Sequence, residues 1–212
     1  MCDLKGTVAI VLAAALFAIC SGAWAGPPTD HLRGRIDRVL QVLEDPALKK
    51  DLKTAERRAT LRRIAEELFD FTEISQRSLG RHWQARTPSE RQEFVALFAD
   101  LLERTYVSKI EGYSGVQVVY AGETLDGDLA TVRTRIVTKQ GTEIPVDYRM
   151  FQRDGGWRVF DVNIEGVSLV GNYRSQFNTL ILRSGYQDVV TKLKTKQDEG
   201  SRETGRPRVE AP

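Results

Sequence analysis

The sequence contains few of the residues that commonly carry chemistry. Its 212 residues include two cysteines, Cys2 and Cys20, and two histidines, His31 and His82. Both cysteines lie in an N-terminal segment that we expect to be removed, which would leave no disulfide and no thiolate metal site. The two histidines are far apart in sequence, which argues against a histidine-based metal site. The sequence therefore predicts a protein without a metal site or a cofactor.

Clustered charge is also missing. The chain has 31 Lys and Arg against 29 Asp and Glu, a formal net charge of +2, and the two signs are interspersed. Nucleic-acid-binding proteins normally present a clustered positive face. Nucleic acid is therefore not an expected partner.

One apolar run stands near the N-terminus, at residues 7–19. It is shorter than the roughly 20 residues needed to span a bilayer. Lys5 precedes it, and Ala23-Trp24-Ala25 offers the small-x-small pattern of a signal-peptide cleavage site. We expect residues 1–25 to be a secretory signal peptide cleaved after Ala25, and the mature chain to lie in the bacterial periplasm without spanning a membrane.

The spacing of apolar residues changes along the mature chain. It is helical as far as the stripe from Phe94 to Tyr106, and it alternates with a period of two after Ser114-Gly115. Short turns between the alternating segments predict an antiparallel meander of four strands, so the fold class is α+β. We expect residues 26–195 to form one domain and the charged residues 196–212 to be a disordered tail.

The segment from Trp157 to Phe177 is the densest in apolar residues. It begins with the alternation of a strand and continues with the spacing of an amphipathic helix. Glu165-Gly166 separates the two parts, and glycine is the residue that bends a chain at least steric cost. We therefore expect a sharp turn at Gly166 that requires glycine.

Candidate catalytic groups are few. Ser168 follows a strand and a glycine, but the G-x-S-x-G pattern of a nucleophile elbow is not met because residue 170 is valine. Asp147 and Asp161 are flanked by apolar residues, so a desolvated carboxylate beside Tyr148 would suit a general base. The simpler interpretation is that each aspartate pairs with an arginine or faces solvent.

These residues resemble those of the Mla-type periplasmic lipid carriers, the MlaC family, also called the toluene-tolerance family of ABC-transport auxiliary proteins. The resemblance covers roughly residues 30–194. Its most specific part is the W-x-V-x-D strand that starts at Trp157, followed by Ile164-Glu165-Gly166-Val167-Ser168-Leu169 and by Asn172-Tyr173-Arg174-Ser175-Gln176-Phe177. Phe69-Asp70-Phe71 and the helix containing Phe94 support it.

The resemblance implies a nuclear-transport-factor-two-like fold, a curved four-stranded antiparallel sheet wrapped by helices around an apolar cavity. It also implies a non-enzymatic, monomeric carrier of a diacyl phospholipid that works between an outer-membrane lipoprotein complex and an inner-membrane ABC transporter. Inward periodicity predicts the lipid-binding residues Phe94, Phe98, Leu101, Val132, Ile136, Ile144, Val146, Tyr148, Phe160, Val162, Leu169 and Phe177. The alternatives are a hopanoid-type carrier, a small cone-fold isomerase or dehydratase that uses Asp147 or Asp161, and a structural adaptor with a filled core.

Overall fold

The computed structural model describes residues 27–48, 53–111 and 115–204, so the predicted signal peptide lies outside the described residues. The helices are α1 (Pro28–Glu44), α2 (Thr54–Leu68), α3 (Phe71–Leu79), the 3₁₀ helix η2 (Gly80–His82), α4 (Pro88–Glu111), α5 (Leu169–Ser184) and α6 (Tyr186–Thr204). The strands are β1 (Gln117–Asp126), β2 (Leu129–Val137), β3 (Glu143–Arg153), β4 (Gly156–Ile164) and β5 (Val167–Ser168).

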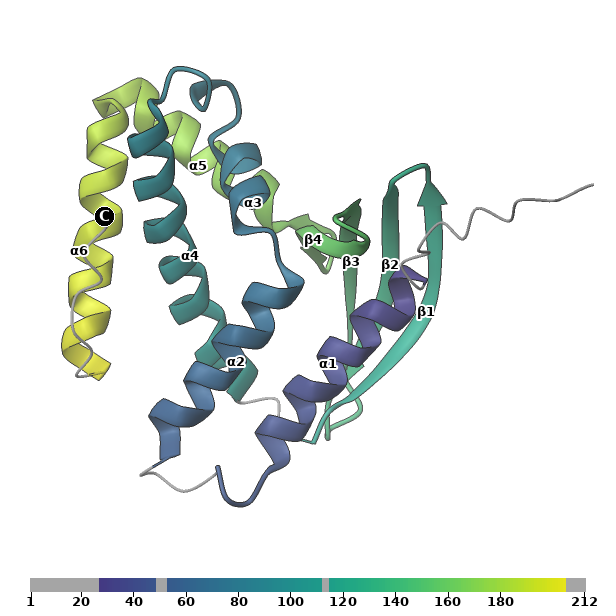
Figure 1. Ribbon diagram of the computed structural model, residues 1–212. Helices are drawn as coiled ribbons and strands as arrows, with labels where there is room; N and C mark the ends of the chain where they lie inside the picture. The colour runs from purple at the N-terminus through teal and green to yellow at the C-terminus, as the bar shows by residue number, and fades with distance from the viewer. Residues whose placement is uncertain (1–26, 49–52, 112–114, 205–212) are drawn as a thin grey trace, which may run out of the picture.

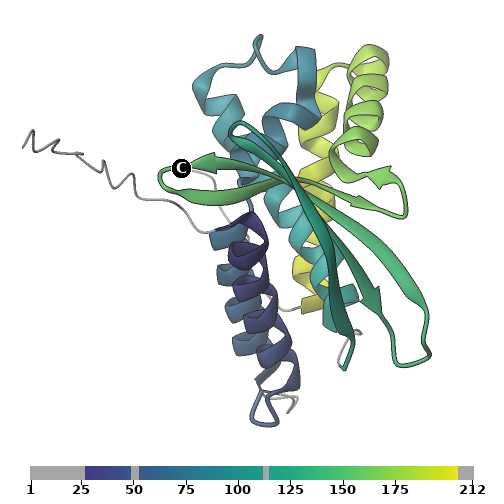
Figure 2. The same ribbon diagram turned by 90° about the vertical axis from the view of Figure 1, so that its right-hand side faces the viewer.

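The strands form one antiparallel sheet in the order β1-β2-β3-β4-β5. The predicted α+β class and the predicted meander are therefore confirmed, and the structure adds a short fifth strand, β5. Figure 1 shows α4 and α6 running side by side, away from the sheet, while α1 lies along it. In Figure 2 the long strands curve across the front of the helices, so the helices occupy one side of the sheet.

The starts of α3 and α4 follow from their sequences. Asp70 accepts a hydrogen bond from the backbone N–H of Glu73 at 2.8 Å and so caps α3. At α4, Thr87 accepts from the N–H of Glu90, and the Glu90 carboxylate accepts from the N–H of Thr87, which completes a reciprocal capping box. These caps fix where the two helices begin, and both helices contribute to the pocket described below.

The buried side chains form two separate cores. The first joins α3, α4, α5 and α6, and its centre is an aromatic group in which the rings of Phe94, Phe98 and Phe177 lie 5.1 to 5.6 Å apart. The second core packs α1 and the end of α2 against one half of the sheet, and its members include Leu32 of α1 and Met150 of β3. The molecule is therefore held together by two clusters, and Phe69 packs against both of them.

The turn after β4 is a two-residue hairpin. Ile164 pairs with Val167, and the residues between them, Glu165 and Gly166, have φ angles of +51° and +85°. Positive φ at both positions is the geometry of a type I′ turn, for which glycine is the least strained residue. The expected sharp turn at Gly166 is confirmed, although a short β5 intervenes before α5 begins.

The C-terminal segment differs from the predicted disorder. Helix α6 continues to Thr204, well past residue 195, while residues 205–212 lie outside the described residues. The polar side chain of Gln197 is buried, and its backbone carbonyl accepts a hydrogen bond from Arg104 at 2.7 Å. The Lys194 ammonium lies 2.6 Å from the Glu93 carboxylate. Contacts of α6 with α4 thus order a stretch that lacks apolar residues of its own.

Candidate functional site

A pocket of about 540 Å³ lies between the two cores. Helices α2, α3 and α4 form one wall, strands β2, β3 and β4 form the other, and α5 and α6 contribute at the margin. Its volume is within the range of about 300–1,000 Å³ that is usual for small-molecule sites. Most of the lining is apolar: Ala65, Phe69, Phe71, Ile74, Ala96, Ala99, Leu102, Ile110, Ile136, Ile144, Val146, Val162, Ile164 and Leu169.

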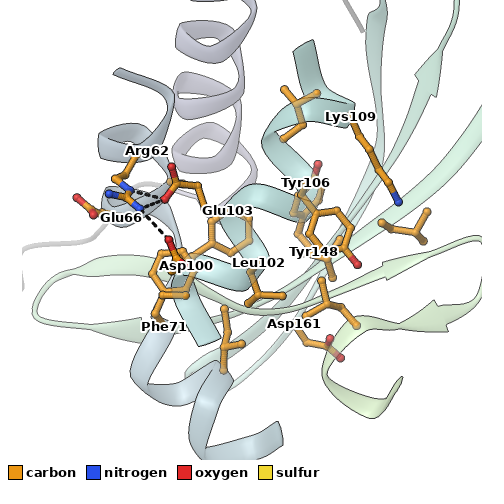
Figure 3. A pocket seen from close by; sticks show the side chains of 18 of the residues that line it. Arg62, Glu66, Phe71, Asp100, Leu102, Glu103, Tyr106, Lys109, Tyr148 and Asp161 are labelled. Carbon is orange, nitrogen blue, oxygen red and sulfur yellow. Dashed lines mark hydrogen bonds and ion pairs between the residues drawn. The ribbon is translucent and has the colours of Figure 1, made fainter. Parts of the chain in front are cut away.

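The polar groups of the pocket gather on two sides (Figure 3). On one side, Arg62 of α2 makes an ion pair with Glu103 of α4 and lies 3.8 Å from Asp100. Asp100 also pairs with Arg104 one turn further along α4. These ion pairs tie α2 to α4 across the pocket, and Glu66 adds a further carboxylate on the same side.

The other side carries Lys109, Tyr106 and Tyr148 (Figure 3). The Lys109 ammonium lies 5.5 Å from the centre of the Tyr106 ring, within the range of a cation–π contact. Burial raises the pKa of the Tyr106 hydroxyl and raises that of Tyr148 still further. Both phenols are therefore protonated at neutral pH and act as hydrogen-bond donors.

Asp161 touches the pocket, but its carboxylate is occupied by local structure. One oxygen accepts from the Ser168 hydroxyl at 2.7 Å, and the other accepts from the Val170 N–H at 3.0 Å. Arg149 adds an ionic contact at 3.6 Å. Because Ser168 in turn accepts from the Gly171 N–H, the two side chains together cap the N-terminus of α5. This cap fixes α5 to strand β4.

Asp147 lies on β3 between the pocket-lining residues Val146 and Tyr148, so alternation places it on the opposite face of the sheet. Its neighbours across the sheet are Arg133 on β2 and Asn163 on β4. Neither aspartate is therefore placed as a free carboxylate inside the pocket beside a tyrosine.

Six of the predicted lipid-binding residues lie on the pocket lining. Five come from the sheet, and they owe their shared direction to the pairing of Ile136 with Ile144 and of Tyr148 with Val162. Leu169 adds the first residue of α5. The six are Ile136, Ile144, Val146, Tyr148, Val162 and Leu169.

The other six lie away from this pocket. Phe94, Phe98 and Phe177 belong to the helical core, and Leu101 packs against it, because α5 and α6 cover that face of α4. Val132 pairs with the pocket-lining Tyr148 and shares its face of the sheet, as expected, but it lies beneath α1, in the second core.

Phe160 is misplaced for a different reason, a β-bulge. The register between β3 and β4 shifts between Arg149 and Met150, which leaves Phe160 without a partner residue across the strands. The bulge breaks the alternation of side chains. Phe160 consequently packs against Phe151 and beneath the Arg77 guanidinium, which lies 4.1 Å from its ring centre.

Sequence reasoning missed the helical wall of the pocket. Ala96, Ala99, Leu102 and Tyr106 recur every three or four residues along α4, beside the aromatic stripe. This second stripe is a detectable signal, but small and polar residues interrupt it. The part played by Ala65 in α2 has no comparable signal, because it depends on how α2 crosses the sheet.

Comparison with known proteins gives a consistent result. Residues 33–195 match the sequence model of the family described as MlaC protein. The intermembrane phospholipid transport system binding protein MlaC of Haemophilus influenzae is 22% identical over 120 residues, which cover 54% of this chain and 56% of that protein. Toluene tolerance protein ttg2D of Pseudomonas putida is 26% identical over 127 residues, or 59% of each chain. These matches span somewhat more than half the length of the two relatives.

A solved structure has the same architecture. The phospholipid-binding protein from Ralstonia solanacearum, determined in complex with a phospholipid, superposes with a TM-score of 0.70 at 27% identity. The superposition covers 79% of this chain and 95% of that one. Within residues 27–48, 53–111 and 115–204, none of the helices is long and apolar enough to cross a membrane.

Proposed function

The chain belongs to the MlaC family, whose model matches most of its length, and from that premise we propose that it is a non-enzymatic phospholipid carrier. The lipid is held by its acyl chains in the pocket between the sheet and α4, with its headgroup near water. The observation that carries the proposal is the pocket itself, which is walled by apolar side chains and lies between two separate cores. The phospholipid bound by the similar Ralstonia solanacearum protein supports the same ligand class.

The energetics of lipid transfer fit such a pocket. Each methylene moved from water into an apolar site gains about 0.8 kcal/mol, so two chains with some thirty carbons gain on the order of 25 kcal/mol. Free diffusion of the lipid through water is therefore negligible. A bilayer interior is about as apolar as the pocket, so exchange between bilayer and protein can be nearly neutral in free energy.

The proposed setting is the periplasm, after cleavage of the signal peptide behind Ala25. There the monomeric carrier would exchange lipid with an inner-membrane ABC transporter complex and with an outer-membrane lipoprotein complex, and so maintain outer-membrane lipid asymmetry. The name of the Haemophilus influenzae relative, an intermembrane transport system component, supports this setting.

No observation favours the alternative of a cone-fold enzyme. Asp161 is engaged in capping α5, and Asp147 lies on the face of the sheet away from the pocket. A structural adaptor would have no use for an apolar pocket of this volume. The carrier is the function that uses the pocket and requires no reactive group.

Native mass spectrometry of the purified protein tests the proposal. We expect a bound species whose mass matches a diacyl phospholipid, identified after solvent extraction. A hopanoid in the extract would keep the carrier function but change the ligand class. Protein that is recovered without lipid, and that takes none from phosphatidylglycerol vesicles, would refute the carrier function.

A further inference from the structure

The two polar sides of the pocket differ in what they offer a ligand. On the Arg62 side, Glu103 and Asp100 already occupy the guanidinium, and their carboxylates add negative charge. Phosphate and ester oxygens only accept hydrogen bonds, so carboxylates beside them are repulsive or inert. This side is therefore a poor place for the anionic part of a phospholipid.

On the other side, Lys109, Tyr106 and Tyr148 offer hydrogen-bond donors, and the nearby Asp161 carboxylate is already held by Ser168 and Val170. Among the described residues, no carboxylate pairs with Lys109 and no group hydrogen-bonds the hydroxyls of Tyr106 or Tyr148, yet all three side chains line the pocket. Half-buried polar groups generally find a partner, because an unmet donor loses its hydrogen bonds to water. A ligand rich in acceptor oxygens would supply those partners.

We propose that Lys109, Tyr106 and Tyr148 form the anchor for the phosphodiester and glycerol-ester oxygens of the bound lipid, which sets its orientation in the pocket. The exposed ammonium of Lys109 meets the phosphate, and the two phenols donate to ester oxygens deeper in. The acyl chains then extend along the apolar lining, past Val146 and Leu102. This inference deepens the proposed function and rests on it.

The geometry of α4 supports this assignment. Tyr106 and Lys109 are three residues apart in the same helix and therefore lie on one face, while Tyr148 projects from the facing strand β3. The three donors thus converge from opposite walls of the pocket. Ion pairs between exposed groups are weak, so the lysine alone would select little, and the two phenols add neutral hydrogen bonds of similar size.

The test compares two lipids with identical acyl chains, dioleoyl phosphatidylglycerol and dioleoylglycerol, each delivered to delipidated protein from cyclodextrin. Lipid bound per protein is measured by mass spectrometry after gel filtration. We expect Lys109→Gln and Tyr148→Phe each to weaken binding of phosphatidylglycerol by about threefold to tenfold. Lys109→Gln should change binding of dioleoylglycerol by no more than about twofold, since that lipid lacks the phosphate. Tyr148→Phe should weaken binding of both lipids, since both carry the glycerol esters to which the phenol donates.

Two matched controls separate this anchor from general effects. Lys192→Gln removes a lysine that pairs with Asp188 on α6, and Tyr186→Phe removes a hydroxyl that donates to the Glu90 carbonyl in the helical core, outside the pocket lining. Both controls should bind phosphatidylglycerol as the wild type does. If either Lys109→Gln or Tyr148→Phe binds phosphatidylglycerol normally, or if Lys109→Gln loses both lipids equally, the anchor is wrong while the carrier function stands. If the wild type binds neither lipid, the carrier function fails and the anchor fails with it.

Discussion

Narrowing the pocket without touching either core should reduce lipid binding and leave folding intact. Ala99 lies on the pocket-facing side of α4 and is half-buried. Ala99→Leu adds three carbons to that wall and keeps a strong helix former in the helix. If each added carbon displaces one lipid methylene, binding weakens by roughly 2.4 kcal/mol, which is about 60-fold.

The same substitution should act in the opposite direction on the protein without lipid. The new side chain covers apolar lining that is otherwise open, so the free energy of unfolding should be unchanged or raised by up to about 1 kcal/mol. A matched control is Ala130→Leu, because Ala130 is buried in the core beneath α1. Overpacking there should lower stability by about 1–3 kcal/mol without changing the lipid bound per folded molecule.

The assay measures how lipid partitions between the protein and cyclodextrin, together with urea unfolding of each delipidated variant. Weaker partitioning in Ala99→Leu at unchanged or higher stability supports the pocket as the acyl-chain site. Unchanged partitioning in Ala99→Leu would refute the reasoning, because three carbons cannot enter an occupied site of this kind without displacing its contents.

Three further outcomes follow from local contacts. Asp161→Ala leaves the buried N–H of Val170 without its acceptor, so urea unfolding should show a loss of about 1–3 kcal/mol, and a smaller loss in Asp161→Asn would identify the hydrogen bond as the cause. Gly166→Val forces a β-branched residue to φ +85°, where the open surroundings add no clash, so a loss of about 1–2 kcal/mol should come from backbone strain alone, with Gly166→Asn losing less. Burial, followed by the charge of Arg35, lowers the pKa of His31 in the folded state. The unfolded chain therefore binds more protons, stability should fall as the pH drops below about 6.5, and His31→Gln should flatten that part of the pH profile in urea unfolding.

The sheet was the part of the fold most open to prediction from sequence. Alternation and short turns located its long strands, and Ile136, Ile144 and Val146 followed onto the pocket lining. The bulge that places Phe160 away from the pocket could not be read from alternation, since one extra residue in a strand leaves the local composition unchanged. Register errors of this kind move a side chain to the other face.

The helices show a different limit. The stripe through Phe94 and Phe98 correctly indicated a buried face of α4, but a buried face can meet a core or a pocket with the same residues. Whether this face of α4 meets a core or a pocket depends on its packing partners, α5 and α6. The predicted end of α6 was too early, because the last turns of this helix are polar. Ala99 faces the pocket because of its position in α4, one turn from Ala96 and Leu102, and small residues such as alanine mark a buried face only weakly.

The position of the pocket between the two cores bears on how a carrier can release its ligand. The aromatic group around Phe98 and the packing beneath α1 are made by protein side chains alone, so neither depends on an occupied pocket. Between them, α2 and α4 make few direct contacts and are linked by the ion pair of Arg62 with Glu103. The Glu103 carboxylate is only 9% exposed, so breaking this pair is costly unless water reaches both partners. The few α2–α4 contacts lie beside the pocket, so we expect its walls to separate there for lipid entry and exit, with water hydrating the ion pair, while both cores remain packed.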